Sequence, residues 1–129
     1  MNQSTLRVLL IGESENGSSY LRGQLENRGC SCWFARATRE SIELFGHYSF
    51  HLILNTTPLH QVNPLLAEMG GSNCSVFYSH PVEDGCWWLP LIRRGQKCVG
   101  VPALRPREFI GELDQMVKEI QLLEDVTAA

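Results

Sequence analysis

Short apolar runs alternate along this chain with segments in which apolar residues recur every three or four positions. Five runs have the length and composition of strands, near 6–11, 32–35, 51–55, 74–79 and 97–101. Four helical patterns lie near 17–28, 38–46, 63–69 and 106–123. Strands that alternate with helices predict βαβ units and a parallel sheet, and runs without polar alternation are typical of strands covered on both faces.

Residues that begin and end helices lie at the boundaries of these patterns. Gly29 follows the first helical pattern, Thr38 opens the second and Pro106 opens the last. The stretch 80–94 contains two prolines and predicts only a short, irregular helix. The pattern as a whole predicts an α/β fold, a flavodoxin-like, doubly wound (βα)5 parallel sheet. We expect a single domain over 1–129 with its core from about 6 to 123.

Composition narrows the classes of function. The chain has 129 residues, 43% of them hydrophobic, and a net charge of -3, so it lacks the basic footprint of a nucleic-acid-binding protein. No apolar run approaches the roughly 20 residues that span a membrane, and the amino terminus lacks a signal-peptide pattern, which predicts a cytoplasmic location. Five cysteines, an odd number, indicate buried thiols rather than disulfides. We expect no metal and no cofactor.

The order and spacing of the strand ends resemble those of a response-regulator receiver domain over roughly 6–123. In that family the first strand ends in acids that hold Mg²⁺, the third in the phosphoacceptor Asp, the fourth in Ser or Thr and the fifth in Lys-Pro. The corresponding residues here are Gly12, Glu13, Asn55 or Thr56, Ser79, Val101 and Pro102. The family's Lys-Pro bond is commonly cis, so the resemblance implies a cis Val101–Pro102 bond.

These residues keep the positions of a phosphorylation pocket but lack most of the functional groups that phosphoryl transfer requires. Neither Asn55 nor Thr56 offers the carboxylate that phosphoryl transfer requires, and Glu13 alone leaves a Mg²⁺ site short of charge. We expect the Thr56 hydroxyl to be satisfied by the loop at the strand end. The resemblance therefore implies a non-enzymatic, non-phosphorylatable signalling domain that acts by protein–protein contact in or beside a two-component phosphorelay.

A small-molecule or metal sensor is the alternative interpretation. Ligands of α/β folds bind at the carboxyl ends of the strands, because the loops there surround a crevice. The residues that could converge at that edge are Glu13, Thr56, His60, Ser79 and His80.

Adjacent tryptophans in the irregular stretch indicate a second functional surface. Receiver domains bind partners or dimerise through the face formed by helix four, strand five and helix five. Tryptophan is enriched in binding hot spots, and charged neighbours supply a polar rim. The predicted partner-binding residues are Trp87, Trp88, Leu91, Ile92 and Arg94. In the alternative, one tryptophan packs in the core and the other lies over Pro81 or Pro90.

Overall fold

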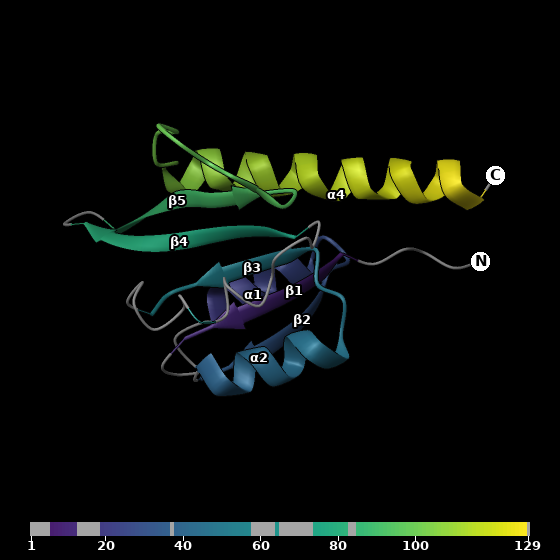
Figure 1. Ribbon diagram of the computed structural model, residues 1–129. Helices are drawn as coiled ribbons and strands as arrows, with labels where there is room; N and C mark the ends of the chain where they lie inside the picture. Colours follow the sequence, from purple (N-terminus) through teal and green to yellow (C-terminus); the bar gives the residue numbers. More distant parts are fainter. Residues whose placement is uncertain are drawn as a thin grey trace.

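The computed structural model describes residues 6–12, 19–36, 38–57, 64, 74–82 and 85–128. The elements are β1 (Arg7–Ile11), α1 (Ser19–Glu26), β2 (Ser31–Ala35), α2 (Thr38–His47), β3 (Leu52–Asn55), β4 (Ser75–Val82), β5 (Gly85–Arg93), β6 (Gln96–Lys97) and α4 (Pro106–Ala128). The strands form one sheet in the order β2-β1-β3-β4-β5-β6 (Figure 1). β2, β1, β3 and β4 are mutually parallel, whereas β5 and β6 are antiparallel to their neighbours.

The first four strands lie where the apolar runs predicted them. β1 and β3 are buried almost throughout. Each has a parallel strand on both sides, and each packs apolar side chains on both faces of the sheet. Their register places Leu10, Leu54 and Phe77 side by side across the sheet. The helix predicted over 63–69 falls almost wholly outside the described residues.

The prediction of a flavodoxin-like, doubly wound (βα)5 parallel sheet is wrong: the sheet is mixed, and the departure lies in the second half of the chain. Residues 85–93, expected as an irregular helix, form β5, which pairs antiparallel with β4, so that Val82 lies opposite Gly85. Aromatic and aliphatic residues dominate this stretch and favour a strand, and Asp-Gly beside an apolar run is a hairpin signal. Pro90 is accommodated next to a bulge between Val76 and Phe77, where strands tolerate proline.

A second tight turn replaces the predicted fifth parallel strand. Arg94 and Gly95 have φ values of 50° and 82°, the left-handed pair that a two-residue type I′ hairpin requires. The Arg94 N–H donates to Ser75 Oγ (3.0 Å) and the Gly95 N–H donates to the Cys74 carbonyl (3.1 Å), so the turn is fastened to the start of β4. Only β6 remains of the strand expected at 97–101.

Beyond β6 the chain runs back along the outer edge of β5. Leu104 forms an antiparallel bridge with Trp88, with N–H···O distances of 2.8 and 2.7 Å. The Val101–Pro102 bond is trans, since the described residues contain no cis peptide bond, and the cis prediction is wrong. The chain between β6 and α4 therefore does not form the expected tight return from a parallel strand into the last helix. It is a connection that is bridged to the edge of β5 at Leu104.

Local signals place the helices as predicted. α1 ends in a Schellman motif: Gly29 has φ 82°, its N–H donates to Glu26 O (2.9 Å), and the Cys30 N–H donates to Leu25 O (3.1 Å). α4 begins at Pro106, and the Glu108 carboxylate accepts a bond from the Arg105 N–H (3.2 Å), which is half of a capping box. The end of α1 and the beginning of α4 are therefore fixed by local residues, Gly29 and Glu108.

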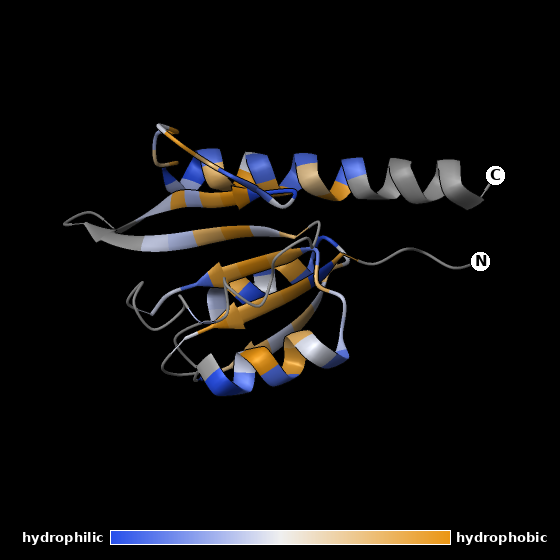
Figure 2. Ribbon diagram, viewed as in Figure 1, coloured by the Kyte–Doolittle hydropathy of each residue, from blue (hydrophilic) through white to orange (hydrophobic). Residues whose placement is uncertain are grey.

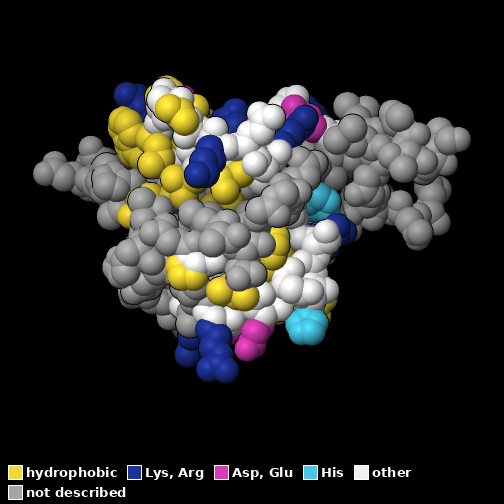
Figure 3. All heavy atoms as spheres, in the orientation of Figure 1, with side chains coloured by type: hydrophobic (Ala, Val, Ile, Leu, Met, Phe, Trp, Pro, Cys, Tyr) yellow, Lys and Arg dark blue, Asp and Glu magenta, His cyan; other side chains and the backbone are white. Residues whose placement is uncertain are grey.

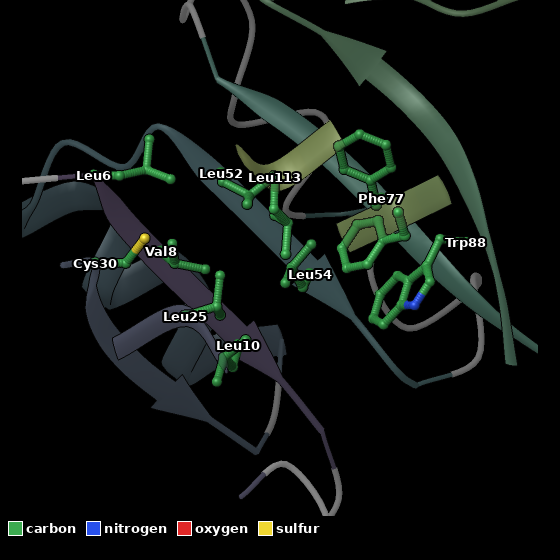
Figure 4. Packing of buried hydrophobic residues seen from close by; sticks show 11 residues of the cluster. Leu6, Val8, Leu10, Leu25, Cys30, Leu52, Leu54, Phe77, Trp88 and Leu113 are labelled. Atoms are coloured by element: carbon green, nitrogen blue, oxygen red, sulfur yellow. The ribbon is translucent and has the colours of Figure 1, made fainter. Parts of the chain in front are cut away.

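Two apolar clusters lie on opposite faces of the sheet. The first core, between the sheet and helices α1 and α4, contains Leu6, Val8, Leu10, Leu25, Cys30, Leu52, Leu54, Phe77, Trp88, Phe109 and Leu113 (Figure 4). The second core, on the α2 face, contains Leu9, Ile11, Ala35, Phe50, Ile53, Cys74 and Val76. Figure 2 shows the apolar strands between helices whose outer sides are polar.

Candidate functional site

The carboxyl ends of β1 and β3 lie level with the middle of β4, and this brings Gly12, Asn55, Thr56 and Ser79 to one level of the sheet. Ile11, Asn55 and Tyr78 are aligned in register across the three strands. Gly12 follows β1 directly and is buried, Thr56 follows β3, and Ser79 lies one residue beyond Tyr78. Asn55 is the last residue of β3 and Thr56 is the first residue after it, and the resemblance leaves both as candidates for the phosphoacceptor position.

Asn55 is fully buried and uses its amide inside the protein. Its Nδ2 donates to the Thr57 carbonyl (2.9 Å), and its Oδ1 accepts from the Thr57 N–H (3.1 Å) and from Thr57 Oγ1 (2.6 Å). The bond to the N–H two residues ahead makes an Asx turn, which starts the loop after β3. An amide satisfied in this way shapes the loop and provides no nucleophile.

Thr56 is exposed, and its hydroxyl is bonded to the backbone. Both the Thr56 N–H (2.8 Å) and Thr56 Oγ1 (2.9 Å) donate to the carbonyl oxygen of Ile11. These two bonds join the end of β3 to the end of β1. The hydroxyl is therefore satisfied at the strand end, as predicted, but its partner is the last residue of β1 and not the loop.

Ser79 does not share a pocket face with Asn55. Successive residues of a strand point to opposite faces, so Asn55 lies in line with Ile53 of the second core, and Ser79 lies in line with Phe77 of the first core. Ser79 is buried and lies opposite Trp88 of β5. Asn55 and Ser79 therefore lie on different sides of the sheet.

Val101 and Pro102 belong to a different part of the molecule. They precede Leu104, which is bridged to the edge of β5 that faces away from β4. β5 therefore stands between this segment and Ser79. The predicted convergence of the residue after strand four with the proline after strand five is wrong, because the expected parallel fifth strand is an antiparallel hairpin.

The alternative metal cluster cannot be assembled from the described residues. Glu13 and His60 lie outside them, as does the side chain of His80. Among the side chains that are described, no three His, Cys, Asp or Glu residues come close enough together to hold a metal ion.

Burial raises the pKa of three thiols, those of Cys30, Cys32 and Cys74. Burial raises the pKa of Cys74 to about 12, and burial together with the neighbouring Cys30 raises the pKa of Cys32 to about 11. Burial also raises the pKa of Cys30, although Arg28 opposes this. Because the thiolate is the reactive form and the metal ligand, these three side chains act as small apolar groups at neutral pH.

The two adjacent tryptophans point to opposite faces of β5. Trp88 is 8% exposed and stacks on Phe109 of α4, with ring centroids 4.3 Å apart and an interplanar angle of 13°. Trp87 is 38% exposed, and the guanidinium carbon of Arg105 lies 5.7 Å from its ring centroid. Strand alternation therefore corrects the prediction that both tryptophans form a contact surface, and it matches the alternative in which one of them is core.

The remaining predicted partner residues also lie in different environments. Leu91 and Ile92 are half-buried and pack against the second core. Arg94 is exposed in the hairpin turn and pairs with Glu119 of α4. Sequence reasoning missed Arg105, whose signal is the distribution of charge: residues 85–107 contain five basic residues and no acid, in a chain of net charge -3.

Apolar side chains gather over the loop and strand at the upper left of Figure 3, beside Lys and Arg side chains. Val99, which is 88% exposed, belongs to the connection between β6 and α4. Exposed apolar groups ringed by charge are the anatomy of an interaction surface.

Comparisons of the chain with protein families, with curated proteins and with solved structures found no match. Within the described part of the chain, every helix is too short or too polar to cross a membrane.

Proposed function

We propose that this chain is a non-enzymatic, receiver-like signalling domain that works by binding another protein and carries no phosphoryl chemistry. The observation that carries the proposal is the state of Asn55. At the strand end where the resemblance puts a phosphoacceptor, this residue is a buried amide with its oxygen and nitrogen bonded to Thr57. A phosphoryl acceptor of the receiver type is a carboxylate that the phosphodonor can reach, and Asn55 is a buried amide.

The partner surface that we propose contains Trp87, Arg105 and Val99. Trp87 supplies a half-exposed aromatic ring, and Arg105 lies over that ring as a cation. Large aromatic side chains dominate binding free energy when a partner desolvates them. Of the five basic residues in the segment from 85 to 107, Arg93 and Arg94 are paired with carboxylates of α4. Arg105, over the Trp87 ring, supplies the cation of the surface, so the fitting partner is a protein with an acidic surface. The resemblance points to a component of a phosphorelay, in the cytoplasm.

The test is capture of partners from a native lysate by the immobilised chain, with each captured protein quantified across variants. Trp87→Ala removes the aromatic anchor and Arg105→Glu reverses its cation. Tyr48→Ala is the control, because Tyr48 is an exposed aromatic residue that packs near Trp33 on the other end of the sheet. If Trp87 is a hot spot, its loss weakens binding by about 2 kcal/mol, roughly thirtyfold.

Support for the proposal is one captured protein that both surface variants and high salt release, and that Tyr48→Ala retains. Capture that is indifferent to Trp87→Ala and Arg105→Glu would refute the partner surface. Incubation with acetyl phosphate and Mg²⁺ tests the chemical half separately: an acyl phosphate on the wild-type chain, seen as added mass that is lost at alkaline pH, would contradict it.

A further inference from the structure

A groove of about 530 Å³ opens between α1 and the beginning of α4, on the face of the sheet that carries the first core. Its volume falls within the range of small-molecule sites. The lining consists of three residues of α1, four of α4 and one of β5, namely Tyr20, Leu21, Gln24, Pro106, Arg107, Phe109, Ile110 and Trp88. Nothing in the receiver resemblance or in the partner surface uses this space.

The walls of the groove are fixed by contacts beside it and by stacking between two of its lining residues. Arg28, just past α1, pairs with Asp114 of α4 (2.5 Å), which ties the two elements together beyond the groove. Phe109 stacks on Trp88 and meets Phe77 edge-on, with centroids 5.4 Å apart at 70°. The capping bond between Arg105 and Glu108 fixes the start of α4. The groove is therefore preformed, which lowers the entropic cost of filling it.

The groove combines an exposed aromatic side chain with one cation. Tyr20 is 79% exposed, the largest fraction among the aromatic side chains that the structure describes. Arg107 is the one charged residue in the lining, and it forms no ion pair with a described residue. An apolar groove with one unpaired cation matches an apolar molecule that carries one negative charge.

We propose that the groove binds a small amphiphilic anion, with its apolar body between Leu21, Ile110 and Trp88 and its carboxylate at Arg107. The Tyr20 hydroxyl and the Gln24 amide add polar contacts from the α1 wall. The site is independent of the proposed protein-binding surface, because Trp87 lies on the other face of β5. The chain thus has a ligand site that does not involve the degenerate pocket.

The three tryptophans make this proposal directly testable by NMR. Their indole N–H signals can be assigned with Trp→Phe variants, and they report on three places: Trp88 on the groove, Trp87 on the opposite face, and Trp33 on the second core. The probes are octanoate and 1-octanol, which share an apolar chain and differ in charge. The variants are Arg107→Gln and, as the matched control, Arg39→Gln on the exposed side of α2.

We expect octanoate to shift the Trp88 signal saturably while the Trp33 signal stays in place, and to bind more tightly than 1-octanol. Arg107→Gln weakens octanoate binding by about fivefold at low salt and leaves 1-octanol unchanged, whereas Arg39→Gln changes neither. A Trp88 signal that does not respond to either probe overturns the site. Equal binding of both probes that Arg107→Gln does not alter overturns the anion. A Trp88 shift that depends on protein concentration alone would mean that a second copy fills the groove, and would also refute the proposal.

Discussion

Exchanging Asn55 for Asp puts a carboxyl group where the structure requires an amide. Nδ2 of Asn55 donates to the Thr57 carbonyl at 2.9 Å, in a fully buried position. An ionised carboxylate would direct an oxygen at that carbonyl oxygen, so a bond becomes a repulsion. A protonated carboxyl can still donate there and preserve the turn. The exchange therefore measures how much of the local structure depends on the amide.

The cost follows from this geometry. Leaving a buried polar group without its partner costs about 1–3 kcal/mol, and confining a charge adds to it, so we expect about 3 kcal/mol at pH 8. Burial and the facing carbonyl raise the pKa of the introduced carboxyl above its ordinary value near 4. A group whose folded pKa is raised contributes full stability below its unfolded pKa and loses it as pH rises. The destabilisation should shrink to about 1 kcal/mol near pH 4.

Urea unfolding at pH 4.5 and pH 8 tests both the size and the sign. The control is Asn27→Asp, which introduces the same charge at an exposed position after α1 and should change stability by only a few tenths of a kcal/mol. Equal stability of Asn55→Asp and wild type at pH 8 would refute the argument that the amide holds the turn. Labelling of Asn55→Asp by acetyl phosphate would further show that the edge is a working receiver pocket that lacks only its Asp.

Three further exchanges test other parts of the structure. Phe109→Ala removes the α4 ring that stacks on Trp88 and should lower the free energy of unfolding by about 3–5 kcal/mol, measured by urea unfolding. Gly95→Ala forces a side chain to φ 82° and should cost about 1 kcal/mol by the same measurement; no loss would contradict the hairpin. Because the Cys74 pKa rises from 9.0 to about 12, its stability contribution is full below pH 9 and is lost toward pH 12. Wild type should therefore lose about 2 kcal/mol more than Cys74→Ala between pH 8 and 10.5, measured by urea unfolding.

The first half of the fold could be predicted from sequence because its signals are local and agree with one another. β1 and β3 are continuous apolar runs, and Gly29 stops α1 with the positive φ that glycine allows. Pro106 opens α4 at the position that proline favours. Parallel pairing of β1, β3 and β4 then follows from helices that alternate with strands.

The second half could not be predicted in this way because its signals conflict. Pro81 and Pro90 argue against a regular element, and the Trp pair interrupts the alternation of apolar and polar residues that marks a half-buried strand. Antiparallel pairing with β4 prevails, since it buries Trp88 against α4 and leaves Trp87 outside. The candidate site suffered from the same error, because its geometry was inferred from a parallel fifth strand.

The hairpin adds a topological reason to the proposal that the chain carries no phosphoryl chemistry. A phosphorylation site of the receiver type needs the group after strand four and the group before the proline after strand five to reach one phosphoryl oxygen. Here Ser79 pairs with Trp88, and Trp88 pairs on its other side with Leu104. Two strand spacings, roughly 9–10 Å, therefore separate Ser79 from the segment that contains Val101. Neither an Asp at 55 nor a Lys at 101 would rebuild the site while β5 stands between them.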